Sequence, residues 1–174
     1  MAPDGNPPAS PTSQLAPSRR LEDRYLESQR RIEADLSAGW QGWDDDQLAY
    51  LRAHRWVVLA TGRRDGSPQL TMVGYVLDDD GALLISAKRY TAKHRNVRRQ
   101  PKVALIVHDD AKQLVIYGTA EGVEDDPRRT DLSVKVFGPI FGKAVDDPVE
   151  LVPTLVREQR TVIRVTPTAA FFQA

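Results

Sequence analysis

Apolar and polar residues alternate along most of the chain after Trp56, and this period of two is typical of half-buried β-strands. The strand-like segments are WVVLATG, SPQLTMVGYVL, ALLISAK, KVALIVHD, QLVIYGTAEGVE, RTVIRVTP and a short terminal AAFFQA. The pairs Asp65-Gly66 and Asp80-Gly81 predict hairpin turns that join the first three strands into an antiparallel meander. Because open sheet edges promote aggregation, six or seven antiparallel strands favour a mainly β fold, a small β-barrel with peripheral helices.

Helical spacing appears before and between these strands. Residues 19–38 place their apolar side chains on one narrow face, and Gly39 is suited to end that helix. Asp44 is expected to open a second helix, because its spacing to Gln47 is that of a capping box. Further helices are predicted after Thr91, around residues 127–136 and from Asp147-Pro148 onward.

The pattern divides the chain into three parts. Residues 1–18 contain five prolines and little that could be buried, so they are predicted to form a disordered tail. Residues 19–45 form a helical extension that is expected to lie across the domain or across a partner subunit. Residues 46–174 contain the barrel, in which Gly118 and Gly122 indicate bulges or a barrel corner.

Composition excludes several kinds of chemistry. The 174 residues include no cysteine, so disulfides, thiol nucleophiles and cysteine-based zinc sites are absent. The three histidines, His54, His94 and His108, are too scattered to indicate a metal site. No apolar run approaches the roughly 20 residues of a membrane span, and no signal-peptide pattern opens the chain, so we expect a soluble cytoplasmic protein without a membrane partner.

Positive charge is concentrated in residues 82–108, although the whole chain balances 24 basic against 24 acidic residues. This stretch contains seven lysines and arginines and no aspartate or glutamate. Thr91 is the expected N-cap of its helix, which would direct backbone N–H groups outward beside Lys93. A helix N-terminus with a lysine beside it favours an anion, so we predict a phosphate site here.

The order of these segments resembles the split β-barrel flavin-binding superfamily of pyridoxamine phosphate oxidases. The resemblance covers roughly residues 46–170 and rests on the strands, the RRDG and DDDG turns, the basic helix and the YGTAEG strand. Within it, TAKHRNVRRQPKVAL is most similar to the branch that uses the deazaflavin coenzyme F420. The resemblance implies a homodimer whose cofactor lies between the subunits, and hydride transfer from reduced F420 to an electron-poor C=C or C=N group of a small molecule.

The family pattern also implies positions for the cofactor. Its phosphate would lie at the start of the basic helix, with Lys93 as the main charge partner; the other residues implied there are Thr91, Asn96, Lys88 and the less favourably oriented Arg95. The ring would lie along the strand at Gln69, Thr71, Met72, Val73 and Gly74. Trp56, Tyr117 and the Phe171–Phe172 pair are expected to contribute from either subunit, or to be core or dimer contacts.

The sequence identifies no catalytic residue. Tyr75, Tyr90 and solvent are all open as the source of the proton that follows the hydride. The VFGPIFG segment, residues 136–142, is interpreted equally well as a lid over the substrate and as a structural turn.

Other functions fit parts of the pattern. An FMN-dependent oxidase or reductase would use the same phosphate site, and a non-catalytic flavin, haem or tetrapyrrole-binding protein would keep the fold without turnover. Haem is less favoured because His94 would have to leave a polar helix to become an axial ligand. A nucleic-acid partner is not expected, since the chain has no net charge and its strands lack interleaved aromatics.

Overall fold

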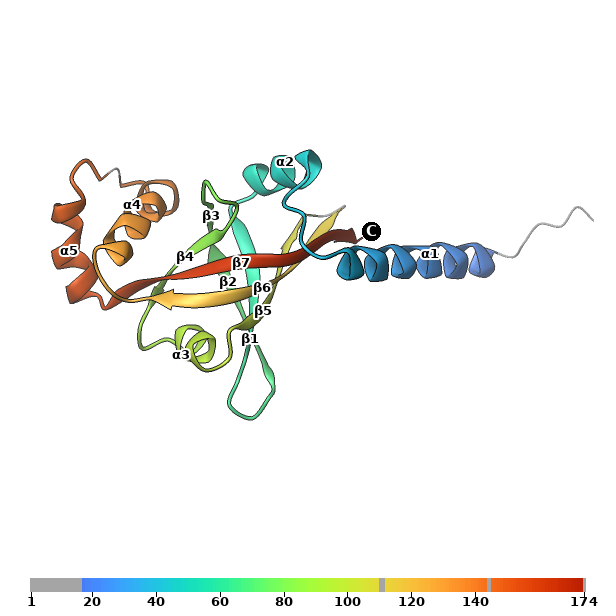
Figure 1. Ribbon diagram of the computed structural model, residues 1–174, viewed down its shortest axis with the longest axis horizontal. Helices are drawn as coiled ribbons and strands as arrows, with labels where there is room; N and C mark the ends of the chain where they lie inside the picture. The colour runs from blue at the N-terminus through green and yellow to red at the C-terminus, as the bar shows by residue number, and fades with distance from the viewer. Residues whose placement is uncertain (1–16, 110–111, 144, 174) are drawn as a thin grey trace, which may run out of the picture.

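The computed structural model describes residues 17–109, 112–143 and 145–173 and contains one seven-stranded sheet (Figure 1). The strands are β1 (Trp56–Gly62), β2 (Pro68–Gly74), β3 (Val76–Leu77), β4 (Leu83–Lys88), β5 (Lys102–His108), β6 (Gln113–Val123) and β7 (Arg160–Gln173). Every pairing is antiparallel, and the order is β2-β1-β5-β6-β7-β4-β3. The predicted mainly β architecture is therefore confirmed.

The two edge strands of the sheet are joined by a single residue. Tyr75 is all that separates β2 from β3, yet these strands lie at opposite ends of the strand order. The sheet therefore curls until its edges approach one another, which is the geometry of a split barrel. The predicted three-strand meander was wrong at this point, because the chain leaves β2 after Gly74 and β4 pairs with β3 and β7 instead.

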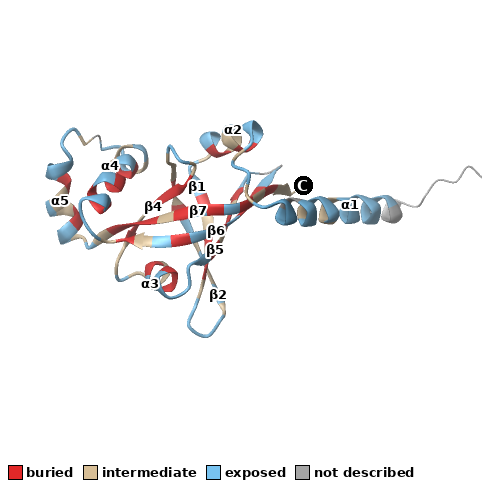
Figure 2. Cartoon of the chain, viewed as in Figure 1, coloured by how far each residue is buried: buried red, intermediate tan, exposed pale blue. Residues whose placement is uncertain are grey.

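The barrel core follows the alternation of the strands. Side chains that point inward are almost fully buried, and they include Val57, Leu59, Leu83, Ile85, Leu105, Leu114, Ile116 and Ile163. β4 and β7 are also buried on their other face, where Leu84 and Val162 pack against Leu132 and Val136 of a helix. Burial on both faces fits the nearly continuous apolar runs of these two strands (Figure 2).

The helices are α1 (Pro17–Ala38), α2 (Asp45–Ala53), α3 (Ala92–Arg99), α4 (Arg128–Phe141) and α5 (Pro148–Arg157). The predicted capping box of α2 is confirmed, since Asp44 accepts from the backbone N–H of Gln47 and the Gln47 side chain accepts from that of Asp44. α5 starts as predicted, with Asp147 as its N-cap. The predicted tail, residues 1–18, lies outside the described residues except for Pro17 and Ser18, which open α1.

Two predicted boundaries were wrong. The segment 136–142 is not a loop, because α4 continues through Pro139 to Phe141 and ends at Gly142 in the left-handed region. The two predicted terminal strands form one, β7, which runs unbroken from Arg160 to Gln173. β6 pairs with β7 from Val162 to Gln173, and the register shifts only between Tyr117 and Gly118, as the glycine there indicated.

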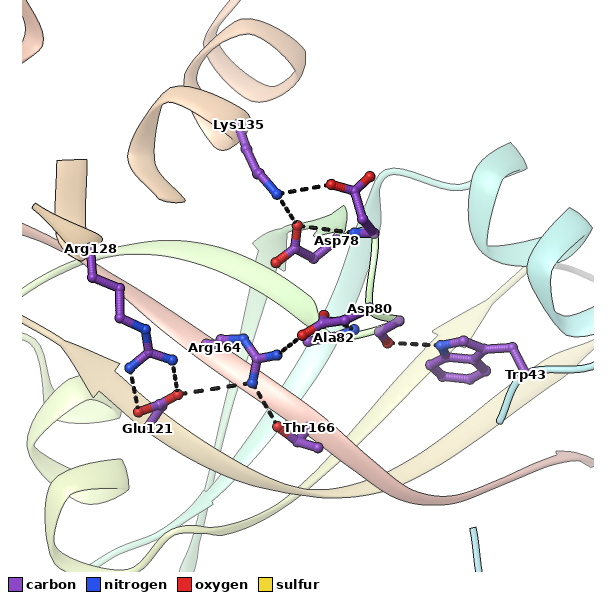
Figure 3. A network of polar contacts seen from close by, with 11 residues as sticks. Trp43, Asp78, Asp80, Ala82, Glu121, Arg128, Lys135, Arg164 and Thr166 are labelled. Atoms are coloured by element: carbon purple, nitrogen blue, oxygen red, sulfur yellow. Dashed lines mark hydrogen bonds and ion pairs between the residues drawn. The ribbon is translucent and has the colours of Figure 1, made fainter. Parts of the chain in front are cut away.

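A network of ion pairs connects α4 and the β3–β4 turn to the sheet (Figure 3). The Nζ atom of Lys135 lies 2.5 Å from Oδ1 of Asp78. On the other side of the turn, Asp80 pairs with Arg164 of β7, whose guanidinium also approaches Glu121 of β6. These contacts are partly exposed, so each contributes little stability alone, but together they orient α4 on the sheet.

One face of the sheet carries exposed apolar side chains, and we call it the outer sheet face. It consists of Trp56, Leu70, Met72 and Tyr117, which are exposed, and of the half-buried residues between them. The strand register places these residues in rows across β2, β1, β5 and β6, for example from Met72 through Val58 to Ile106 and Val115. Large apolar patches of this kind usually mark an interaction surface.

Among the described residues, no helix is long and apolar enough to cross a membrane. In the same residues, no group of three or more His, Asp or Glu side chains is arranged to hold a metal ion.

Candidate functional site

The basic helix α3 closes one end of the barrel and presents two different faces. His94, Asn96 and Val97 are buried against the strands, whereas Arg95 and Arg98 are exposed. The helix packs against β1, β4 and β6 (Figure 1). His94 and Val97 are three positions apart and Asn96 lies between them, so all three project from one side of this short helix.

A cavity of about 730 Å³ lies where α3 meets the β1–β2 hairpin. Its lining consists of Arg63, Arg64, Asp65, Gln69, Ala92, Arg95, Asn96 and Arg99. The lining therefore contains four arginines and one carboxylate, that of Asp65. The Oδ2 atom of Asp65 lies 3.8 Å from Nη2 of Arg63. An excess of arginine in a concave site favours an anionic ligand, because each guanidinium offers several N–H donors in a planar fork.

Asn96 connects the walls of this cavity. Its Nδ2 donates to Oε1 of Gln69 on β2 at 2.9 Å and to Oγ1 of Thr61 on β1 at 3.1 Å. Its Oδ1 accepts from Nη2 of Arg99 at 3.0 Å, and the same nitrogen donates to the carbonyl of Gly62 at 2.7 Å. Asn96 is buried, both N–H donors of its amide bond to the protein and its oxygen accepts from Arg99, so we assign it the role of positioning Arg99.

The structure brings two of the predicted phosphate residues, Arg95 and Asn96, together with the predicted ring residue Gln69 in the lining of this cavity. Arg95 thus lies inside the cavity although its orientation on the helix argued against it. Lys93 is half-buried on the same helix but is not among the lining residues. Burial lowers the pKa of Lys93, and among the described residues no carboxylate pairs with this ammonium.

Thr91 and Lys88 have other contacts. Thr91 occupies the N-cap position of α3, but its hydroxyl donates to the carbonyl of Lys88 at 2.7 Å and no side chain caps the helix start. The ammonium of Lys88 lies 5.8 Å from the centre of the Tyr90 ring. The predicted N-cap residue is therefore correct, whereas the capping hydrogen bond is replaced by a turn contact.

The predicted ring residues on β2 point to different sides. Thr71 and Val73 face the barrel interior with the core residues of β1, and Met72 belongs to the outer sheet face. The space beside Gly74 is taken by Ile140 of α4, since a Cβ atom there would lie 2.9 Å from the Ile140 Cδ1. β2 pairs only with β1, so the backbone groups of its other edge remain available to a ligand.

The two tyrosines considered as proton donors differ in exposure. Tyr75 is buried inside the barrel, its hydroxyl donates to the carbonyl of Leu51 at 2.8 Å, and burial raises its pKa well above the usual range. Tyr90 is exposed at the start of the α3 region. Of these two residues, only Tyr90 is therefore accessible to a substrate.

Sequence reasoning missed three of the four cavity arginines. Arg63 and Arg64 were interpreted only as part of the RRDG turn, and Arg99 only as general positive charge. Arg95 and Arg99 are four positions apart on a helix, a spacing that places them on one side and could have indicated their shared role. The link from the 63–64 turn to α3 depends on tertiary structure, because nearly thirty residues separate Arg64 from the start of α3 in the chain.

The opposite side of α3 carries a separate, internally paired cluster. Glu124 lies 3.3 Å from Nε2 of His94, 3.4 Å from Arg98 and 3.5 Å from Arg89. Burial lowers the pKa of His94, and this effect outweighs the attraction of the Glu124 carboxylate. The basic charges on this side thus share the acidic partner Glu124, whereas among the four cavity arginines only Arg63 approaches a carboxylate of the described chain, that of Asp65.

These features define the class of protein. A curled antiparallel sheet whose two edge strands are joined by one residue, with a helix packed at one end, is the architecture of a split β-barrel. The family model described as pyridoxamine 5'-phosphate oxidase matches residues 44–174, and the chain belongs to this family.

Solved structures agree with this assignment. A conserved hypothetical protein from Mycobacterium tuberculosis is 25% identical, with a TM-score of 0.62 over 75% of this chain and 84% of that one. A protein described as an F420 reductase is 26% identical, with a TM-score of 0.51 over 67% of this chain and 89% of that one. A haem storage protein from Vibrio cholerae, 18% identical with a TM-score of 0.58 over 75% and 94%, shares the fold.

Proposed function

We propose that this protein is an F420-dependent oxidoreductase that transfers hydride from the reduced deazaflavin to an electron-poor C=C or C=N group of a small organic molecule. The observation that carries the proposal is the arginine-lined cavity at the start of the edge strand β2. The similarity to a protein described as an F420 reductase supports the same cofactor class.

The residues present fit such a cofactor. Arg63, Arg64, Arg95 and Arg99 offer positive charge and N–H donors to an anionic group, and Asn96 accepts a hydrogen bond from Arg99. The free edge of β2 provides backbone donors and acceptors for a heterocyclic ring. When bound, the cofactor supplies the hydride, and the protein contributes binding and orientation.

The proposal includes a homodimer with the cofactor site at the subunit interface. The outer sheet face supports it, because Met72 and Leu70 of β2 are exposed next to the strand edge that would contact the ring. A second copy covering this face would remove apolar surface from water and would enclose the cofactor, which strengthens electrostatic contacts inside the site.

A fluorescence titration of the purified protein with F420 and, in parallel, with FMN tests the proposal. We expect F420 to bind at low micromolar concentration or better and more tightly than FMN. Tighter binding of FMN would move the protein to flavin oxidase or reductase chemistry with the same anion cavity. Binding of neither would contradict the assignment of the cavity to a cofactor.

A non-catalytic carrier or sensor is the second candidate, since the fold is shared with a haem storage protein. His94 argues against a haem ligand in this chain, because it is buried against Glu124 and Gly122 and points away from solvent. Tight F420 binding without hydride transfer to any of a panel of activated alkenes and imines would support the carrier instead.

A further inference from the structure

Helix α1 has an apolar stripe that the rest of the chain covers only in part. Leu21, Tyr25, Ile32 and Leu36 recur at helical spacing and lie on one side of the helix. Figure 1 shows α1 running away from the barrel, with only its C-terminal end beside β7. Ile32 is half-buried there, whereas Leu21 and Tyr25 are 65% and 62% exposed.

The N-terminal half of α1 lacks the packing that usually stabilises a helix. Every side chain from Arg20 to Glu27 is exposed (Figure 2). In proteins, most of the stability of a helix comes from packing of its apolar face against other structure. A surface that covers the apolar stripe would therefore stabilise this half of α1.

The stripe continues directly into the outer sheet face. A groove of about 570 Å³ between α1 and the end of β7 is lined by Ile32 of α1 and Phe171 of β7. Phe171 pairs with Val115 of the outer sheet face, and its ring centre lies 6.1 Å from that of Tyr117. A partner that covers the outer sheet face thus meets α1 at its edge.

We propose that the N-terminal half of α1 packs on a second copy of this chain, with Leu21 and Tyr25 as its main contacts. The inference rests on the homodimer of the proposed function and adds a contact outside the cofactor site. In a two-fold dimer the same surface is used by both copies, so each α1 would reach across the interface in the same way.

The apolar area available agrees with a second copy as the occupant. The exposed side chains involved are Leu21, Tyr25, Leu36, Trp56, Leu70, Met72 and Tyr117. At about 200 Å² for a fully exposed side chain of this size, their exposed fractions amount to roughly 800 Å². A stable interface of standard size buries about 800 Å² on each partner, so α1 and the outer sheet face together provide what one dimer requires.

Site-specific crosslinking tests the contact directly, because the chain contains no cysteine. Full-length Tyr25→Cys and Arg30→Cys proteins would each be labelled with a benzophenone maleimide and irradiated. Arg30 is exposed on the opposite side of α1 and is the matched control. We expect a covalent dimer from position 25 and little from position 30. Crosslinks confined to a single chain at position 25 would overturn the proposal.

Dimer dissociation provides the second measurement. Leu21→Glu combined with Tyr25→Glu adds two negative charges to the stripe, and Arg30→Glu changes the charge by the same amount on the other side. In sedimentation equilibrium, we expect the double variant to raise the dimer dissociation constant at least tenfold and Arg30→Glu to leave it within a few-fold.

The outcomes separate this inference from the proposed function. A wild-type protein that is monomeric would contradict both the α1 contact and the homodimer. A dimer whose dissociation constant is unchanged by the double variant would contradict the α1 contact alone. Cofactor preference is measured by the F420 and FMN titrations, so failure of the F420 assignment would appear there and not in the crosslinking.

Discussion

At the scale of single residues, the arginine cavity gives the most direct prediction. Arg95→Ala should weaken F420 binding by about ten- to a hundredfold, because a charge-assisted hydrogen bond contributes roughly 1.5–3 kcal/mol. Arg98→Ala is the matched control, since Arg98 lies on the same helix but pairs with Glu124 outside the cavity. Fluorescence titration measures both, and equal losses would show a general charge effect instead of a specific site.

Lys93 and Arg95 can be compared in the same experiment. The sequence predicts the ten- to hundredfold loss for Lys93→Ala, whereas the cavity lining favours Arg95. A large loss for Lys93→Ala with little change for Arg95→Ala would return the main charge contact to Lys93. Comparing the two variants therefore identifies which side of α3 binds the anionic group of the cofactor.

His94 gives a prediction on pH. Burial holds its pKa below the ordinary value, so the folded protein keeps this imidazole neutral while the unfolded chain takes up a proton near pH 6.5. Stability should therefore fall as the pH drops below about 6.5, by no more than about 1.4 kcal/mol per pH unit from this group. His94→Gln should lose less stability than wild type between pH 7.5 and 5.5.

Urea unfolding of both proteins at the two pH values measures this difference. The comparison isolates His94, because Glu124, Arg89 and Arg98 remain in both proteins around the same position. An identical loss of stability in the two proteins would mean that His94 titrates alike in the folded and unfolded states.

At the scale of elements, the contact between α3 and β6 depends on Gly122. A Cβ atom at this position would lie 2.6 Å from Nε2 of His94, closer than packed atoms allow. Gly122→Ala should therefore reduce the free energy of unfolding by about 1–3 kcal/mol. In a His94→Ala background the same change should cost clearly less, because the clashing ring is gone; additive losses would contradict the steric explanation.

Element boundaries show where periodicity is sufficient and where it is not. The start of α2 and the N-cap of α5 were predicted because the capping residues act within one helical turn. The end of α4 was missed, because Phe137 packs with Leu151 and Leu155 of α5 and Ile140 packs beside Gly74. Such contacts keep the chain helical through Pro139, and they are not visible in local sequence.

At the scale of the whole molecule, the outer sheet face should control assembly. Met72→Glu places a charge in this face and should shift the protein toward monomer, with weaker F420 binding if the cofactor lies between subunits. Val149→Glu is the control, since Val149 is a similarly exposed apolar residue on α5. Sedimentation equilibrium measures both, and a Met72→Glu protein that remains fully dimeric would exclude this face as the interface.

The sequence by itself determined the strands, most helices, the mainly β class and the basic helix α3. These features depend on contacts within a few residues, such as alternation, capping boxes and Asp-Gly turns. It also placed Gln69, Arg95 and Asn96 in the candidate site through the family resemblance, and all three line one cavity.

Only the tertiary structure decided which charges of α3 are free and which are paired. Glu124 neutralises one side of the helix, while the β1–β2 turn brings Arg63 and Arg64 to the other. It also decided that the chain after Gly74 crosses to the far edge of the sheet. These outcomes depend on residues that are far apart in the chain. Such residues come close together only when the sheet curls and buries its core, and no local sequence pattern specifies which of them will meet.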